Sequence, residues 1–381
     1  MIAHNQACIA PESPHLITTQ PPQTWLEIST AAFNHNAAYY KKLIGAHHKL
    51  AAVIKGNGYG HGLEQIAFLC EQNKDIDWLC VAQLSEALAL ENISKPILVL
   101  GYADVNPEYA VNKNIHFMVD HLEYAHALHT IGKKHSYRFN IHIKVDTGLS
   151  RMGVLAADAV SFIQRLQTYD YLSITGIYSH FSASDSNPLF THHQQNIFSQ
   201  LLEQLTYHNI AIDHVHMSNS AALSTITFTP HFNFFRVGIG LYGIGHDRVH
   251  LKPVMTWKTH ITNIKTIPAH SAVSYYGEYQ TTKKTRVALL PIGYYDGYKF
   301  NFSNKTSVLI NGSYAPVLGR VAMNITIVDV TEIDTHIGDE VIIMGPYATI
   351  DPHHLATLGN IVNVREILVG INKVFTRIIT E

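Results

Sequence analysis

Lys55 stands where a buried strand is expected to end and a glycine-rich loop begins. Apolar residues 52–54 lead into it, and glycine occupies every second position from Gly56 to Gly62. Burial disfavours the charged form of a lysine, so it lowers the pKa and leaves a nucleophilic neutral amine. That environment suits a lysine that forms a Schiff base with a carbonyl compound. The alternative is a loop lysine whose amine reaches solvent.

The glycines do not make a dinucleotide-binding fingerprint. Gly58 and Gly60 begin a GxG pair, but no third glycine follows at the required spacing. Lys55 also precedes the loop, and the dinucleotide-binding fingerprint has no lysine at that position. The chemistry indicated by this stretch is therefore that of the lysine amine.

Polar residues and glycines follow four further apolar runs of the chain. They are residues 144–148, His180, residues 218–220 and Arg236. The carboxyl ends of parallel barrel strands meet at one face, and loops at that face carry the chemistry in such folds. These residues are therefore expected to converge with Lys55.

Short apolar runs alternate with amphipathic segments between residues 50 and 245. Strands are expected over 51–56, 78–82, 96–102, 115–119, 139–148, 173–181, 214–220 and 234–243. Helices are expected over 31–43, 63–71, 83–91, 123–131, 156–167 and 191–208. Apolar strands without alternation are buried on both faces, and crossover helices indicate a parallel sheet. The pattern predicts an α/β fold with a (β/α)8 TIM barrel over residues 23–250.

The pattern changes after about residue 250. Residues 251–381 contain shorter runs with β-branched enrichment and partial alternation, which predict a separate, mostly antiparallel β domain. Residues 1–22 are polar and contain proline, so we expect a disordered leader there.

Composition excludes several classes of protein. The chain has 381 residues, only 15% are charged, and the net charge is −2, which does not favour nucleic acid or an acidic membrane surface as a partner. No apolar run is long enough to span a membrane, and the N-terminus lacks signal-peptide features. The scatter of three cysteines indicates a reducing compartment, so a soluble cytoplasmic protein is expected. The 26 histidines show no zinc-site spacing, and no metal is expected.

Eight motifs in order resemble those of the alanine racemase family, which uses pyridoxal 5'-phosphate on a fold of type III. They are AVIKGNGYGHG (52–62), HIKVDTGLSRMGV (142–154), GIYSHFSASD (176–185), HMSNSAA (216–222), FRVGIGLYG (235–243), VSYYGEY (273–279), PIGYYDGY (291–298) and GRVAMN (319–324). The resemblance extends over nearly all of residues 24–377. It implies a barrel, a C-terminal β domain, and a homodimer with two shared active sites that take a small amino-acid substrate.

The resemblance assigns a pair of bases. Lys55 matches the lysine that carries the cofactor and serves as base on one face of Cα. Tyr275 matches the second base, which the partner subunit contributes. His180 and Arg236 match the residues that lower the pKa of this tyrosine, and Arg236 also faces the pyridine nitrogen of the cofactor.

The remaining positions carry over in the same way. Tyr59, Ser220 and the backbone amides of Gly238 and Ile239 match the phosphate site. Arg151, Met323 and Asn324 stand at substrate-binding positions, Tyr294 lies in the entryway, and Lys144 matches a lysine that is carbamylated in many members.

Two positions depart from the family pattern. Asn324 replaces an aspartate beside the substrate carboxylate, and Arg365 stands where a tyrosine normally donates to the phosphate. An arginine could pair with the phosphate, or it could face a longer or anionic substrate. Both departures fall at the mouth of the site rather than at the two bases.

The sequence therefore predicts interconversion of L-alanine and D-alanine, with D-alanine used for peptidoglycan. The alternative is a racemase of broader specificity that accepts serine, lysine or arginine, as Asn324 and Arg365 permit. A decarboxylase of this fold needs a C-terminal cysteine, and no cysteine follows Cys80. A non-catalytic cofactor-binding protein would lack both Tyr275 and the β domain.

Overall fold

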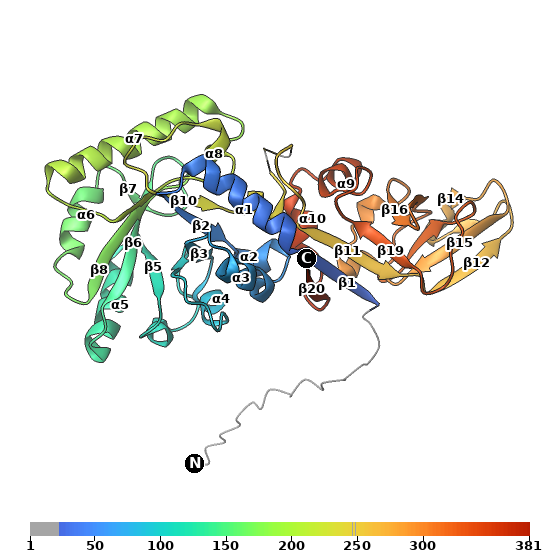
Figure 1. Ribbon diagram of the computed structural model, residues 1–381, viewed down its shortest axis with the longest axis horizontal. Coiled ribbons are helices and arrows are strands. Elements are labelled where there is room, and N and C mark those ends of the chain that lie inside the picture. The colour runs from blue at the N-terminus through green and yellow to red at the C-terminus, as the bar shows by residue number, and fades with distance from the viewer. Residues whose placement is uncertain (1–22, 246, 248) are drawn as a thin grey trace, which may run out of the picture.

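Two sheets at opposite ends of an elongated molecule organise the chain (Figure 1). The computed structural model describes residues 23–245, 247 and 249–381. The leader predicted over residues 1–22 lies outside the described residues. In the described part of the chain, none of the helices has the length and apolar character needed to cross a bilayer.

The larger sheet is a nearly closed barrel of parallel strands, as predicted. Its order is β10, β2, β3, β4, β5, β6, β8, β9, with the short β7 beside β6. The strands are β2 (Lys49–Val53), β3 (Trp78–Val81), β4 (Ile97–Val99), β5 (Ile115–Val119), β6 (Phe139–Asp146), β7 (Val154–Leu155), β8 (Leu172–Tyr178), β9 (His214–His216) and β10 (Phe234–Val237). Each strand pairs in parallel with its neighbours in this order.

Helices on the outside connect these strands. They are α1 (Thr30–Ile44), α2 (Lys55–Tyr59), α3 (Leu63–Gln72), α4 (Leu84–Leu88), the 3-10 turn η1 (Pro107–Ala110), α5 (Leu122–His135), α6 (Ala159–Leu166), α7 (Pro188–Tyr207) and α8 (Ala222–Thr225). Local sequence sets where they begin. The Ser29 hydroxyl accepts from the amide of Ala32, and the side chain of Asn187 accepts from that of Phe190.

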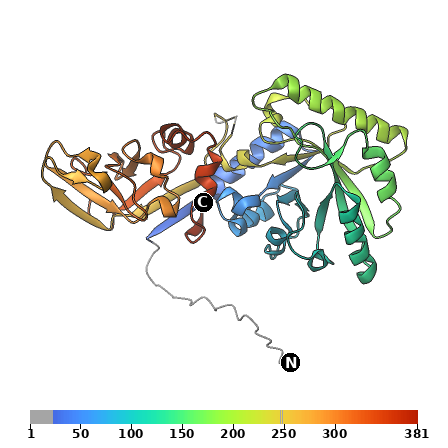
Figure 2. The ribbon, with the colours of Figure 1, turned by 180° about the vertical axis from the view of Figure 1, so that it is seen from behind.

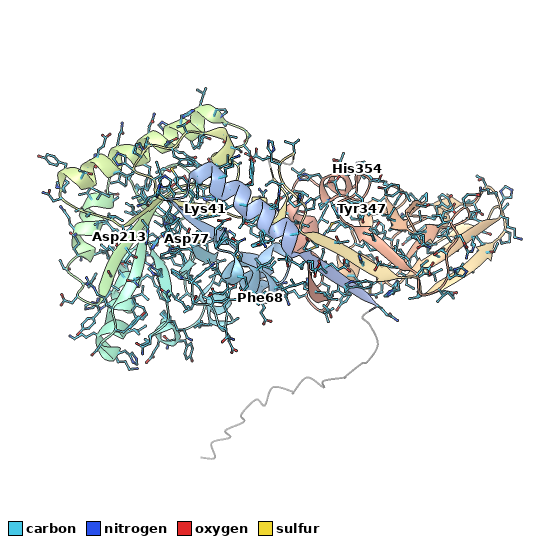
Figure 3. The ribbon with its side chains drawn as sticks, viewed as in Figure 1. Lys41, Phe68, Asp77, Asp213, Tyr347 and His354 are labelled. Atoms are coloured by element: carbon cyan, nitrogen blue, oxygen red, sulfur yellow. The ribbon has the colours of Figure 1, made fainter. Side chains whose placement is uncertain are left out.

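The amino-terminal face of the barrel is fastened by Asp77, which precedes β3. Its carboxylate accepts from Lys41 Nζ on α1 at 3.0 Å, from Lys49 Nζ at 3.0 Å and from the amide of Leu50 at 2.9 Å. Figure 3 labels Lys41 and Asp77 beside each other at this face. This ion pair ties α1 to the amino-terminal face of the barrel, whereas the loops that carry chemistry in barrels of this type lie at the opposite face.

The interior of the barrel combines aromatic and polar rings with aliphatic side chains such as Val53 and Leu98. Trp78 and Phe234 lie in it together with the buried side chains of His116, His142 and His216. The rings contact one another edge to face and in tilted stacks. These positions alternate along their strands with residues that face the surrounding helices, as in other barrels.

The second unit is mostly antiparallel, as predicted. A six-stranded sheet has the order β17, β16, β19, β11, β1, β20, and a three-stranded sheet has the order β12, β15, β18. The strands are β1 (Thr24–Ser29), β11 (Met255–His260), β12 (Asn263–Ile267), β13 (Ala272–Val273), β14 (Tyr279–Gln280), β15 (Thr285–Leu290), β16 (Ser307–Ile310), β17 (Ser313–Pro316), β18 (Thr326–Asp329), β19 (Glu340–Met344) and β20 (Thr376–Thr380). Two α-helices, α9 (Pro352–Leu358) and α10 (Arg365–Val369), and the 3-10 turns η2 (Ile239–Tyr242), η3 (Tyr275–Gly277), η4 (Tyr294–Asp296) and η5 (Phe300–Phe302) complete the described elements.

Strand β1 lies in this second sheet and not in the barrel. It pairs antiparallel with β11 and parallel with β20, and Leu26 and Ile28 are fully buried. A six-residue apolar strand carries no local signal for the sheet it will join, which is why the stretch before α1 was expected in the barrel. The domain boundaries 23–250 and 251–381 remain a proposal, with β1 placed among the strands of the second unit.

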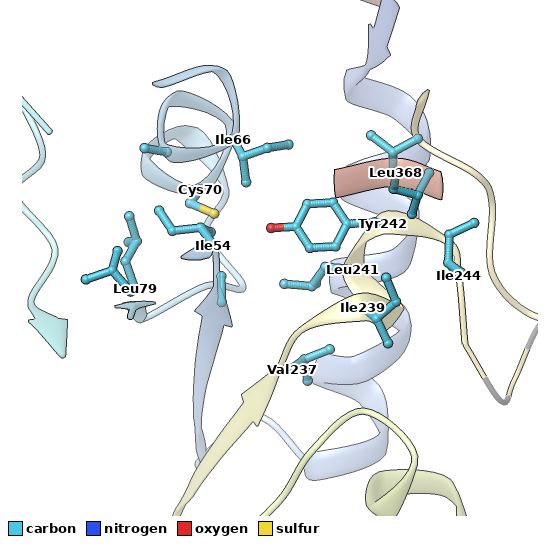
Figure 4. Close-up of a cluster of buried hydrophobic side chains, with 14 of the residues drawn as sticks. Ile54, Ile66, Cys70, Leu79, Val237, Ile239, Leu241, Tyr242, Ile244 and Leu368 are labelled. Atoms are coloured by element: carbon cyan, nitrogen blue, oxygen red, sulfur yellow. The ribbon is translucent and has the colours of Figure 1, made fainter. Parts of the chain in front are cut away.

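The two units share one hydrophobic core. Tyr242 packs at their junction beside Ile54 of the barrel and Leu368 of α10 (Figure 4), and its hydroxyl donates to Val53 O at 3.0 Å. Arg377 of β20 donates from Nη2 to Gly60 O at 3.1 Å. The C-terminal segment therefore buttresses the loop that follows Lys55.

Candidate active site

A cavity of about 900 Å³ opens at the carboxyl ends of the barrel strands. Among its lining residues are ten of the positions predicted for the site. They are Lys55, Tyr59, Lys144, Arg151, His180, Ser220, Arg236, Gly238, Ile239 and Arg365. The convergence predicted from polar residues at strand ends is thus present in the fold.

Lys55 follows β2 at the start of a left-handed turn. Residues Gly56 to Tyr59 all have φ between 51° and 65°. A residue with a Cβ costs about 1–2 kcal/mol in this conformation, so glycine at positions 56 and 58 relieves half of the turn. The carboxylate of Glu86 fixes the start of the turn, since it accepts from the amide of Gly56 at 2.7 Å.

The surroundings of Lys55 shift its amine toward the neutral form. Burial lowers its pKa, and the guanidinium of Arg151 lowers it further, against a smaller opposing effect of Glu86. A neutral amine is the form that attacks carbonyl carbon and accepts protons. The predicted activation of this lysine by burial therefore has a physical cause in the structure.

Arg236 is a buried cation held by neutral acceptors. Its Nη2 donates to Ser179 O at 2.9 Å and to His180 Nδ1 at 3.2 Å, while Nη1 donates to His216 Nδ1. Only 2% of the residue is exposed. No carboxylate forms a salt bridge with it in the part of the chain that the structure describes. The guanidinium therefore keeps its positive charge available to the cavity.

Lys144 lies close to Arg236 over a shared aromatic ring. Its Nζ lies 4.6 Å from the centroid of Tyr178, and the guanidinium carbon of Arg236 lies 5.1 Å from it. Burial holds the pKa of Lys144 well below its usual range, and Arg236 and then Arg151 add repulsion. The side chain is 4% exposed and is disposed to be an uncharged amine.

Hydrogen-bond donors gather at the other side of the cavity. Ser220 Oγ accepts from the amides of Gly238 and Gly240, each at 3.1 Å. The hydroxyl of Tyr59 lies beside Gly238, where a Cβ would come within 2.7 Å of it. Arg365 lines the same cavity, and its charge lowers the pKa of Tyr59 against the larger raising effect of burial. The hydroxyls of Ser220 and Tyr59 and the guanidinium of Arg365 form a donor set suited to a phosphate, and Ser220 also holds the neighbouring amides in place.

Four predicted site residues lie elsewhere, on the surface of the second unit. Tyr275 is 65% exposed, Met323 53% and Tyr294 45%, and Asn324 is exposed as well. Tyr275 lies in η3, just before β14 (Figure 1), and the reverse view in Figure 2 also places that end of the molecule away from the barrel. These side chains do not line the cavity of their own chain.

The sequence reasoning missed His216 and Tyr178. His216 accepts from Arg236, and the Tyr178 ring stacks on His216 with centroids 4.7 Å apart while it also contacts Lys144 and Arg236. A signal was present, because His216 stands two residues before Ser218 and Tyr178 two residues before His180. Side chains two apart on a strand share a face, so both point toward the barrel axis with the site residues above them.

Comparison with known proteins agrees with these features. The pattern of the alanine racemase N-terminal domain matches residues 28–246, and that of the alanine racemase C-terminal domain matches residues 254–379. The alanine racemase of Halothermothrix orenii is 35% identical over 364 residues, which cover 92% of this chain and 95% of the relative. That of Methanococcus maripaludis is 36% identical over 337 residues, with 85% and 90% covered.

Solved structures show the same architecture. The alanine racemase of Clostridium difficile 630 superposes with a TM-score of 0.88 at 31% identity, covering 95% of this chain and 97% of that one. The alanine racemase of Bacillus anthracis, determined with bound L-Ala-P, superposes with a TM-score of 0.83 at 27% identity and covers 96% of each chain. By sequence pattern and by fold, the chain belongs to the alanine racemase family.

Proposed function

We propose that the protein interconverts L-alanine and D-alanine with pyridoxal 5'-phosphate as cofactor. The observation that carries this proposal is the pairing, in one cavity, of a buried lysine at the end of β2 (Lys55), whose pKa burial lowers, with a buried guanidinium that has no carboxylate partner among the described residues (Arg236). The former can bind an aldehyde and move a proton, and the latter can face a neutral ring nitrogen. D-alanine made in this way would supply peptidoglycan synthesis in the cytoplasm.

The residues present fit this cofactor. Ser220, Tyr59, Arg365 and the amides of Gly238 and Ile239 would hold the phosphate, and Lys55 would hold the aldehyde carbon. The missing side chain of Gly238 supports this fit, because a Cβ there would fill the space against Tyr59 Oη. When bound, pyridoxal 5'-phosphate acidifies the Cα–H bond of the amino acid attached to it.

Four residues of the cavity would each have one task in this reaction. Lys55 Nζ takes or returns the Cα proton on one face. Arg236 cannot give up a proton, so it would face the ring nitrogen of the cofactor as a donor and leave that nitrogen unprotonated. Arg151 lines the cavity and would bind the substrate carboxylate. His180, held by Arg236, would lower the pKa of the second base together with that arginine.

Tyr275 of a partner subunit is proposed as the second base. Among the described residues that line the cavity the tyrosines are Tyr59 and Tyr178, and burial raises the pKa of both phenols. Neither is therefore suited to accept a proton. Tyr275 is exposed in η3, next to β14, at the end of the molecule that lies away from the barrel (Figure 1). It therefore cannot reach the cavity of its own subunit, which supports a homodimer in which each subunit completes the site of the other. Met323, Asn324 and Tyr294 would enter the site by the same route.

Lys144 is proposed as a site of carbamylation. An uncharged lysine amine can attack carbon dioxide, which forms an N–C bond and releases the amine proton to solvent. The resulting carbamate is an anion, and its neighbours Arg236 and Arg151 are the two cations that now repel the ammonium form. The product would hold Arg151 in place and offset part of the buried positive charge.

A substrate scan tests the proposal. The purified protein, loaded with pyridoxal 5'-phosphate, is incubated with each L-amino acid, and the D form is measured by chiral chromatography. Racemisation of alanine well above all others supports the assignment. Comparable rates on serine, lysine or arginine would show a racemase of broader specificity. A cofactor-loaded protein that racemises no amino acid would refute the proposal.

A further inference from the structure

Two fully buried imidazoles continue from Arg236 into the barrel. His216 Nδ1 accepts from Arg236 Nη1, and His216 Nε2 lies 2.9 Å from Nδ1 of His142. His142 stands two residues before Lys144 on β6, so it lies on the same face and one layer deeper. A continuous side-chain network thus joins the cavity to the interior of the barrel.

Only one arrangement of protons satisfies this network. A guanidinium has donors and no acceptor, so His216 Nδ1 must be without a proton. A neutral His216 then carries its proton on Nε2 and donates it to His142 Nδ1. His142 must in turn carry its own proton on Nε2. Burial holds the pKa of both imidazoles well below the usual range, which keeps both rings neutral.

The fold reserves space for the ring of His142. Gly176 is its partner in the register of β8, and a Cβ on that glycine would lie 2.3 Å from His142 Nδ1. At the other side of the ring, Nε2 has no hydrogen-bond partner within the described residues. An apolar side chain would fill the same space without an unsatisfied N–H. The benefit of histidine at position 142 therefore lies at Nδ1, which accepts from His216.

We propose that His142 is a positioning residue that fixes the guanidinium of Arg236 through His216. By accepting from Nε2 it holds the His216 ring in one orientation, so that Nδ1 faces Arg236. The geometry of this network stands on its own, and only the use of Arg236 toward a cofactor ring rests on the proposed function. The stack on Tyr178 keeps the plane of the His216 ring, but without the acceptor nothing selects which ring nitrogen faces Arg236, so the hold on the guanidinium weakens.

Substitutions at position 142 can separate the loss of the hydrogen-bond acceptor from the loss of side-chain volume. His142→Asn keeps an acceptor at the position of Nδ1, whereas His142→Leu removes it. His142→Phe removes it while keeping the shape of a ring, and it replaces the leucine variant if that chain does not fold. The matched control is His116→Leu, because His116 is also buried in the barrel and contacts the His142 ring edge to face, but it hydrogen-bonds to Thr175 and has no hydrogen bond to this network.

The first measurement uses cofactor-free protein labelled with ¹⁵N in histidine and arginine. Long-range proton–nitrogen spectra are expected to show the proton of both His142 and His216 on Nε2. The side-chain signals of Arg236 should shift or broaden in His142→Leu and stay unchanged in His116→Leu. A proton on Nδ1 of either histidine, or a charged ring, overturns the proposal whether or not the protein is a racemase.

The second measurement is racemase activity. His142→Leu should lower kcat roughly tenfold with little change of KM, as expected when an interaction is lost in the transition state alone. His142→Asn should recover most of that loss. Equal behaviour of His142→Leu and His116→Leu in both measurements would show that His142 only fills space, and would overturn the proposal.

Discussion

A Cβ on Gly238 would lie 2.7 Å from the hydroxyl oxygen of Tyr59, so the two residues cannot both keep their places if position 238 carries a side chain. Gly238→Ala should therefore displace one phosphate donor and disturb its own amide. We expect the Kd for pyridoxal 5'-phosphate to rise roughly tenfold, the loss of about one hydrogen bond to a charged group. Titration of the cofactor-free protein, followed by absorbance, measures this.

The clash itself can be isolated with a double-mutant cycle. Tyr59→Phe removes the hydroxyl that the new methyl group would meet. In that background Gly238→Ala should weaken cofactor binding much less than it does in the native chain, because interacting residues are not additive. Purely additive effects would show that Gly238 acts on the phosphate site without Tyr59.

Replacement of Lys55 tests the covalent anchor. Lys55→Ala should remove the visible absorbance of the bound cofactor and abolish racemisation, since no other amine at this position can bind the aldehyde. Absorbance spectra of the purified variant after desalting make the comparison. Retained absorbance would transfer the anchoring role to Lys144, which lines the same cavity.

Mixed dimers test whether the site is shared. Lys55→Ala and Tyr275→Phe chains should each be nearly inactive alone. After unfolding and refolding together, half of the dimers would contain one intact site of two, which restores roughly a quarter of native activity. Activity assays on the refolded mixture give the answer, and no recovery would show that Lys55 and Tyr275 do not complete one site from two different subunits.

The control for the mixed-dimer experiment uses two variant chains whose substitutions lie in the same cavity. Lys55→Ala mixed with Arg236→Leu should recover nothing, because both residues belong to the same side of each site. Recovery in this mixture would mean that refolding, and not complementation, restores the activity.

Arg365 can be assigned to phosphate or to substrate. Its charge acts on the buried phenol of Tyr59, so it lies near the phosphate donors. Arg365→Leu should raise the Kd for pyridoxal 5'-phosphate about tenfold, at the lower end for a charge-assisted bond because the residue is exposed. The relative rates on alanine, serine and lysine should change little. An altered substrate range with unchanged cofactor affinity would place it at the substrate.

Buried histidines should make the fold sensitive to acid. Burial lowers the pKa of His61 to about 4 and that of His116 to about 3. In the unfolded chain both titrate near 6.5, so below that pH the unfolded state binds protons that the folded state refuses, and stability falls. At pH 5 the loss is about 2 kcal/mol for each group.

Urea denaturation between pH 7 and pH 5 measures this loss. His116→Leu removes one of these groups and should flatten the dependence by about the share of one histidine. A free energy of unfolding that stays constant over this range would mean that the barrel admits water to these rings.

Much of the fold could be predicted because the barrel has a periodic signal. Continuous apolar strands such as β5 stand out from their surroundings, and polar residues at strand ends such as Arg236 indicate which face carries the chemistry. Strand β1 could not be assigned, because its partners β11 and β20 lie far along the chain and pairing leaves no local trace.

In the site, too, local features could be predicted from the sequence, whereas contacts between distant segments could not. The glycines around Asn57 indicated a special turn, but its left-handed course depends on support from Glu86, Leu368 and Arg377. The link from Arg236 to His142 was beyond reach for a different reason. It joins three strands, and no spacing in sequence encodes a contact between them.

The position of β1 between β11 and β20 in the second sheet bears on how the chain is made. A ribosome releases β1 first, yet its neighbour β11 begins 231 residues later, and β20 is finished almost last. At about 5–20 residues per second, β1 waits roughly 10–50 s for its first partner. Throughout that interval Trp25, Leu26 and Ile28 form an unpaired apolar strand at the start of a nascent chain. A chaperone that shields this segment during translation would protect an apolar stretch whose partner strands are not yet made.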